Sequence, residues 1–412
     1  MGLALVVLLD LLNRSQFLEA HYTDDGVLPR DFMHRILWQP TYFCFHAWSG
    51  SLVWQQLLFV FAFGFALLLL LGYQSRWMII MSWLLLVSLQ NRNQYLLNGG
   101  DQLLRLLLFW AIFLPLGERY SIDARSKEVR KTNAHFSIAT VGLLLQIAWM
   151  YLSAGISKII VSDFSFENVR FMTDLAGPLF NLFLLLPVVV AKPLIFGQIL
   201  FPLLLLIPYR NRFSRLVFIG AFALFHFANL LFFRLGVFSW VGLLGLLAIY
   251  PPSNSEANPA QPSWGFKEVA AITLLFYVLI INIASVCAFS LPHAIMMPAY
   301  ALRLDQRWNM FSGESMKQAV RVQLEGEYSN GEKIKLAEPY QSFRWRNYLY
   351  YTPFIHESGF KENVLRYVCD ERNQIHGGTS KMKMVRILET RYRHKQEILD
   401  MESRVIFECA CN

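Results

Sequence analysis

Charged residues are scarce in this sequence, and their scarcity argues against a water-soluble protein. Asp, Glu, Lys and Arg make up 16% of the 412 residues, whereas 55% are hydrophobic. A soluble chain of this length carries more charge and fewer apolar residues. Before residue 290 the apolar residues form successive runs, such as 57–72, 179–190 and 269–288. One such run could be a buried helix of a soluble protein, but their close succession predicts membrane-embedded helices.

Cysteines are few, and no two have the Cys-x-x-Cys spacing of a metal or redox site. The chain has five of them: Cys44, Cys287, Cys369, Cys409 and Cys411. The GxSxG, HExxH and Walker A motifs are also missing from any usable context, as are zinc-finger and RNA-binding motifs. We therefore expect no metal site and no nucleic-acid partner, although the net charge is +8. The basic residues lie largely in the C-terminal tail and in short loops between apolar runs, where they set membrane orientation.

The apolar runs predict an all-α polytopic membrane helical bundle of about nine segments. The first run lacks a basic start and a small-residue cleavage site, so we interpret it as a helix and not as a signal peptide. Three prolines, Pro187, Pro193 and Pro202, predict that the sixth segment is kinked or broken. The expected segments are 1–20, 51–72, 77–97, 102–117, 136–157, 179–208, 215–233, 236–250 and 267–289.

Lysine and arginine are concentrated in two loops, 118–135 and 209–215. Cytoplasmic loops of membrane proteins carry an excess of these two residues, so both loops are expected in the cytoplasm. An even number of predicted crossings separates the loops, which makes the two assignments consistent. Counting outward from them places the N-terminus in the cytoplasm and everything after residue 290 outside it.

The composition changes after Leu291, where charged residues become frequent and apolar runs shorten. We expect a transmembrane domain over 1–290 and a small extracytoplasmic α+β domain over 291–412. Outside the cytoplasm, Cys369 could pair with Cys409 or with Cys411. The expected elements of this domain are strands 319–328 and 333–336 around a turn at 329–331, a helix at 359–372, and strands 382–392 and 403–411.

Lys158 is the most informative polar residue in the predicted membrane segments. Tyr151, Ala154, Gly155 and Lys158 lie on one face at helical spacing. The small residues between the two polar ones leave room for a flat molecule or for a close neighbouring helix. A lysine desolvated there could act as a base or a nucleophile. The alternative is that Lys158 ends the helix and reaches to the membrane interface.

Other polar residues in or beside the apolar runs have both a structural and a functional interpretation. His226 and Asn229 are three residues apart and can share a helix face, as a hydrogen-bonded histidine or a catalytic one. Asp10 and Arg14 are four apart and can neutralise each other. A polar cluster between the third and fourth segments is either a site or a turn in which Asp101 caps the next helix; it comprises Asn91, Arg92, Asn93, Asn98, Asp101 and Arg105.

Several stretches in this order resemble the HTTM domain, which is shared with the vitamin K-dependent γ-glutamyl carboxylase. They cover most of residues 1–312, and their order and spacing are jointly specific. Ala154-Gly155-Ile156-Ser157-Lys158 is similar to the segment that carries the carboxylase's catalytic lysine. Asn93 stands where the family has a histidine. The other stretches are 22–29, 98–101, 114–117, 120–123, 225–240 and 306–311.

The resemblance implies quinone-linked chemistry, with reduced vitamin K or a related quinol as cofactor and oxygen and carbon dioxide as co-substrates. In the carboxylase, the lysine deprotonates the quinol, and oxygen converts the quinol to an epoxide by way of a strong base. That base removes a γ-proton from glutamate, and the carbanion takes up carbon dioxide. By the resemblance, Lys158 would be the base, with His226 and Asn93 as further catalytic candidates.

The leading hypothesis is therefore a carboxylase-like enzyme in contact with membrane lipid, acting on glutamate in a peptide or protein. Its cofactor would contact Tyr151, Ala154, Gly155 and Asn229. A second hypothesis is a non-enzymatic membrane helper for peptide maturation or export, since one group of HTTM proteins looks like helpers of toxin peptide maturation. A third is a carrier of lipids or small molecules.

Overall fold

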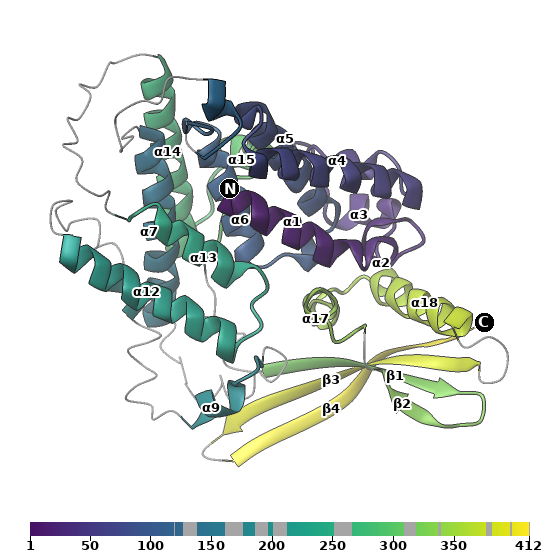
Figure 1. Cartoon of the computed structure of the whole chain (residues 1–412). Coiled ribbons are helices and arrows are strands. Elements are labelled where there is room, and N and C mark those ends of the chain that lie inside the picture. Colours follow the sequence, from purple (N-terminus) through teal and green to yellow (C-terminus); the bar gives the residue numbers. More distant parts are fainter. Residues whose placement is uncertain are drawn as a thin grey trace.

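The computed structural model describes residues 1–118, 120–126, 138–160, 176–185, 197–200, 212–250, 266–308, 319–336, 339–375, 381–395 and 398–411. A helical N-terminal part is followed by a four-stranded sheet near the C-terminus (Figure 1). Helices α17 (Phe343–Tyr350) and α18 (Ser358–Ile375) lie between the sheet and the helical part (Figure 1). The sheet domain therefore meets the helical part through these two helices.

The described helices of the N-terminal part follow most of the predicted segments. They are α1 (Gly2–Ser15), α2 (Leu18–Tyr22), α3 (Arg30–Ile36), α4 (Leu52–Leu71), α5 (Ser75–Arg92), α6 (Gly99–Ala111), α7 (Ile138–Ile160), α9 (Phe180–Leu184), α12 (Arg212–Phe232), α13 (Phe238–Leu247), α14 (Phe266–Val286) and α15 (His293–Ala301). The short helices α3 and α15 were not predicted. Most of the predicted sixth segment, including its three prolines, lies outside the described residues.

Four of these helices are long and apolar enough to cross a membrane. They are α4 and α12 over their full lengths, α7 over 138–158 and α14 over 269–286. The helical membrane architecture is thus supported, but the predicted number of about nine segments is not confirmed. Helices α1, α6 and α13 have 14, 13 and 10 residues. At 1.5 Å per residue they are too short to span the roughly 30 Å hydrocarbon core as straight helices.

Local sequence signals fix several helix ends. The Ser51 hydroxyl accepts a hydrogen bond from Trp54 N at the start of α4, and Gly72 ends α4 in the left-handed conformation at φ 69°. At the start of α6, the Asn98 side chain accepts from Asp101 N, and the Asp101 carboxylate accepts from Asn98 N. This capping box confirms the structural interpretation of Asp101.

The sheet domain contains β1 (Ala319–Tyr328), β2 (Lys333–Lys335), β3 (Met382–Lys395) and β4 (Ile398–Ala410) in the antiparallel order β2-β1-β3-β4. The predicted strands and the helix α18 are confirmed, with β3 and β4 longer than expected. Helix α17 was not predicted, because its sequence contains no apolar run. Its buried residues Trp345, Tyr348 and Leu349 have the i, i+3, i+4 spacing of one helix face.

Four buried charged residues, Asp10, Arg14, Asp101 and Arg344, attach α17 to the helical part; we call them the buried ion-pair cluster. Arg14 donates to Asp10 at 2.7 Å, which confirms the predicted pair, and to Asp101 at 2.6 Å. Arg344 of α17 donates to both oxygens of Asp101, at 2.7 and 2.9 Å, and forms an ion pair with Asp10. The cluster has two charges of each sign, so its net charge is zero. It joins α1, α6 and α17, which lie far apart in the sequence.

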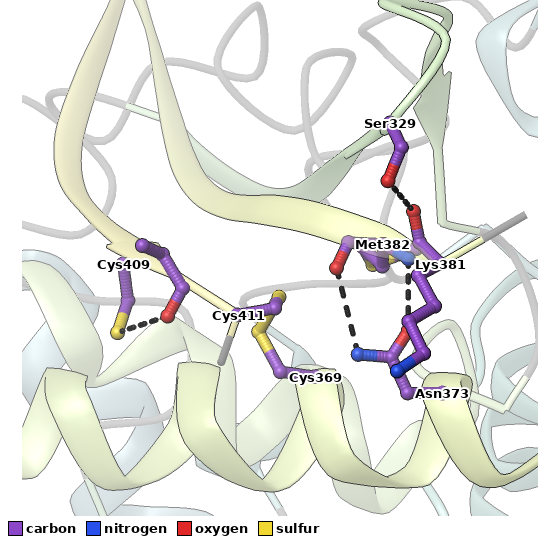
Figure 2. Close-up of a disulfide and its surroundings, with 8 residues drawn as sticks. Ser329, Cys369, Asn373, Lys381, Met382, Cys409 and Cys411 are labelled. Atoms are coloured by element: carbon purple, nitrogen blue, oxygen red, sulfur yellow. Dashed lines mark hydrogen bonds between the residues drawn. A yellow bond between two sulfur atoms is a disulfide. The ribbon is translucent and has the colours of Figure 1, made fainter.

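Cys369 of α18 forms a disulfide with Cys411, just beyond β4 (Figure 2). The structure thus selects one of the two predicted pairings. The thiol of Cys409 stays free and donates to Ala410 O at 3.4 Å. Burial raises the pKa of this thiol, which lowers its thiolate fraction at neutral pH and slows any exchange with the disulfide.

We expect Cys369→Ala to destabilise the sheet domain, because the disulfide closes a loop of 42 residues in sequence. Loss of such a bond costs roughly 2–4 kcal/mol. Hydrogen exchange of the β3 and β4 amides, followed by mass spectrometry, should accelerate accordingly. Cys409→Ser is the matched control and should leave these rates unchanged. Equal rates in wild type and Cys369→Ala would show that the disulfide contributes nothing to the domain.

Candidate functional site

Lys158 lies two turns beyond Tyr151 on α7, near the end of the helix, and its side chain is buried. The residue is 4% exposed, and its Nζ donates to Ala154 O at 3.0 Å. Among the described residues it makes no ion pair with a carboxylate. The side chain therefore folds back along its own helix. A charged ammonium in such a place is costly to bury without a counter-ion.

Tyr151 and His226 form a buried hydrogen-bonded pair between α7 and α12. The Tyr151 hydroxyl and His226 Nε2 are the two partners. His226 is fully buried and Tyr151 is 1% exposed. Phenylalanine rings surround the pair: Phe222 and Phe225 of α12 contact Tyr151, and Phe238 of α13 contacts His226. The pair is thus a polar contact in an apolar environment, where such a bond is stronger than in water.

Gly242 of α13 makes the space that the imidazole of His226 occupies. A Cβ built on Gly242 would lie 2.1 Å from His226 Cε1 and 2.3 Å from Nε2. These distances are far shorter than carbon–carbon and carbon–nitrogen contacts allow. The position of His226, and with it the bond to Tyr151, therefore depends on a glycine at this place in the neighbouring helix.

The small residues of α7 have different surroundings. Ala154 is 1% exposed, and its carbonyl accepts the bond from Lys158. At Gly155, a Cβ would lie 2.1 Å from Ile199 Cγ1, so the short segment Gly197–Leu200 packs directly against α7. Of the two uses expected for the space at Gly155, the structure shows the close neighbouring segment.

Asn93 makes none of these contacts, whereas Asn229 lies on the same helix as His226. Asn93 lies at the end of α5, where its side-chain amide donates to His21 O at 3.1 Å. No hydrogen bond links it to Lys158, Tyr151 or His226 within the described part of the chain. Asn229 is half-buried on α12, one turn after His226.

Two contributions to the site were not foreseen from the sequence. The first is α13, which supplies Gly242 and Phe238. A signal was present, since Gly242 and Gly245 lie three apart, and Gly245 packs against Ile147 of α7. The second concerns the packing of α7 and not the site groups themselves: the side-chain oxygen of Gln306 accepts from Gln146 of α7 at 2.6 Å. The segment after α15 therefore packs against α7.

The arrangement can hold and transfer protons. Lys158 offers an amine with a single described hydrogen bond, and Tyr151 and His226 offer a hydroxyl and an imidazole on the same side of α7. The described residues contain no group of three histidines, cysteines or carboxylates that could hold a metal ion. Proton transfer or covalent attack by the amine are the reactions that these side chains support.

Comparison with curated proteins finds no match to this chain, and comparison with solved structures finds none. The HTTM domain matches residues 35–253, just over half of the 412 residues. The matched region contains Tyr151, Lys158, His226 and Gly242. Together with the apolar helices, this match identifies an integral membrane protein. The chain belongs to the HTTM domain family.

Proposed function

We propose that this protein is a carboxylase-like membrane enzyme that uses a reduced quinone of the vitamin K type to carboxylate glutamate in a peptide or protein. The observation that carries the proposal is the buried amine of Lys158, two helical turns from the Tyr151–His226 hydrogen bond. The resemblance of residues 154–158 to the lysine segment of the carboxylase supports it. So does the presence of both groups inside the matched HTTM region.

In this proposal, Nζ of Lys158 accepts a proton from a hydroxyl group of the quinol. One N–H of the neutral amine donates to Ala154 O, which holds the nitrogen in place and leaves its lone pair for the proton. His226, fixed by Gly242, orients the Tyr151 hydroxyl toward the same face of α7. A bound quinol would, with oxygen, supply the strong base that removes the γ-proton of glutamate. The overall reaction would convert quinol, oxygen, carbon dioxide and glutamate to epoxide, water, γ-carboxyglutamate and a proton.

The residues around Lys158 fit a flat apolar ring in part. Ala154 leaves its face of α7 without a bulky side chain, and Phe222, Phe225 and Phe238 provide aromatic surface beside Tyr151 and His226. At Gly155, a ring would have to displace Ile199. The side chain of Asn93 donates a hydrogen bond to the backbone of His21, and no described hydrogen bond joins it to Lys158. We therefore assign it no part in the reaction.

The proposal includes an orientation with the N-terminus in the cytoplasm and the sheet domain outside. Arg344 of the sheet domain contacts Asp10 in the last turns of α1 and Asp101 in the first turn of α6. These two helix ends therefore lie on the same side as the sheet domain, as the loop charges predict. The disulfide between Cys369 and Cys411 supports an extracytoplasmic location for that side.

The test is incorporation of labelled carbon dioxide into a glutamate-rich peptide by purified protein supplied with reduced vitamin K. Wild type should incorporate label, and Lys158→Met, which is isosteric but has no basic nitrogen, should incorporate at least 100-fold less, as expected for loss of an essential base. Lys335→Met, which removes an exposed lysine of β2, is the matched control. Equal incorporation by wild type and Lys158→Met would exclude Lys158 as the base.

A further inference from the structure

A second group of charged residues lies beside the buried ion-pair cluster. Among its described residues, positive charges outnumber negative ones. Arg105 of α6 and Arg303, which follows α15, are 2% and 3% exposed. Among the described residues, the carboxylate nearest to them is Asp305, whose side chain is 25% exposed. Arginine stays protonated at any physiological pH. The three residues therefore carry a net charge of +1, whereas the buried ion-pair cluster carries none.

Each guanidinium is held in place by neutral groups. Arg105 donates to Gln90 Oε1 at 2.9 Å and to Asp305 O at 2.8 Å. Arg303 donates to Asn91 Oδ1 at 2.6 Å. Its guanidinium carbon also lies 5.0 Å from the centre of the Tyr42 ring. These contacts orient both arginines but do not neutralise them.

Asp305 only partly supplies the missing negative charge. One of its oxygens lies 3.2 Å from Arg303 Nε, and the other lies 4.0 Å from Arg105. The Nε groups of both arginines are buried and make no hydrogen bond within the described residues. Among the described residues, Arg105 Nε thus has no acceptor, and Arg303 Nε has only the 3.2 Å ion contact with Asp305. Arg303 also has φ 50°, in the left-handed region that few residues other than glycine adopt.

We propose that Arg105 and Arg303 form a binding site for a small monovalent oxyanion of the carboxylate type. Such an anion would bring the net charge of these three residues to zero. It would accept from Arg105 Nε, and from Arg303 Nε in competition with Asp305. Guanidinium groups bind planar carboxylates with two parallel hydrogen bonds. Asp305 is the exposed member, so it marks the side from which an anion enters, and its own carboxylate competes with the ligand.

This site does not depend on the reaction proposed for Lys158. The anion could be a free carboxylate or bicarbonate, or the carboxylate of a peptide side chain. A phosphate dianion carries one charge more than the group requires. Acetate and bicarbonate at equal ionic strength therefore test a monovalent ligand, and inorganic phosphate tests a ligand of higher charge.

The experiment measures the unfolding temperature of the purified full-length protein in detergent as acetate replaces chloride at constant ionic strength. A ligand that binds only the folded state raises this temperature saturably, and we expect a rise of roughly 3 °C. Arg303→Gln should abolish the rise. Arg307→Gln, which changes an exposed arginine four residues later, is the matched control and should keep it.

The effect of Asp305→Asn on acetate affinity distinguishes an anion-binding site from a purely structural role of the two arginines. Removal of the competing carboxylate should tighten acetate binding at least tenfold, and acetate should restore any stability that the substitution costs. Bicarbonate should act like acetate, and phosphate should act more weakly. The proposal is overturned if wild type shows no saturable rise, or if Asp305→Asn binds acetate no more tightly than wild type does.

Discussion

Arg344→Met is expected to lower the free energy of unfolding by about 3–5 kcal/mol, because it leaves the buried ion-pair cluster with an unbalanced charge. In wild type, Arg344 contacts Asp101 through two hydrogen bonds and Asp10 through an ion pair, and also donates to Leu96 O at 2.8 Å. Methionine fills similar space but offers no donor. Two buried carboxylates would then share Arg14 alone, with a net charge of −1.

The same substitution should loosen the sheet domain from the helical part, because Arg344 is the only residue of the cluster that comes from α17. Denaturant unfolding in detergent measures the stability, and limited proteolysis between α15 and α17 measures the loosening. Arg366→Met is the matched control: it breaks an exposed pair with Glu362 on α18 and should cost less than about 1 kcal/mol. If both variants unfold alike, the cluster does not hold the domains together.

Gly242→Ala is expected to have the second-largest effect, since its methyl group would overlap the imidazole of His226. The nearest ring atom would lie 2.1 Å from the new carbon, so either the ring or α13 must move. Overpacking of this kind costs roughly 1–3 kcal/mol. Movement of the ring would also break its bond to Tyr151. We therefore expect lower stability together with loss of most of the proposed activity.

Gly220→Ala separates this effect from a general sensitivity of the helices to substitution. Gly220 lies on α12, the helix that carries His226, and a Cβ there would have nothing within 4 Å. The change should be neutral or should stabilise the helix by up to about 1 kcal/mol. Unfolding temperature and enzymatic activity of the two variants provide the comparison. Full activity in Gly242→Ala would show that the position of His226 is unimportant for the reaction.

The sequence predicted most elements whose own residues show a pattern. Apolar runs located α4, α7, α12 and α14, and alternation around the turn at 329–331 located β1 and β2. Helix α17 was missed because its structure depends on partners distant in sequence: Asp10 and Asp101 neutralise the buried guanidinium of Arg344. The choice of Cys411 over Cys409 likewise depends on where β4 ends against α18.

The sequence could predict which site residues share a face of one helix, but not the contacts between helices. Spacing on α7 placed Tyr151, Ala154 and Lys158 on one face, and the structure keeps them there. Spacing could not show that His226 bonds Tyr151, because this contact joins two helices. The family resemblance grouped Asn93 with the site, whereas the Asn93 side chain donates to the backbone of His21 in the structure. Contacts between helices require the packing of the whole bundle.

The most direct test of the central claim is epoxide formation from reduced vitamin K and oxygen by the purified protein. It examines the quinol step alone, so an unsuitable acceptor peptide cannot obscure the result. We predict that wild type forms epoxide and that Lys158→Met, with an unchanged unfolding temperature, forms none. Absence of epoxide from folded wild-type protein, or equal amounts from the variant, would contradict the role of Lys158. The first of these results would favour the non-enzymatic helper of peptide maturation.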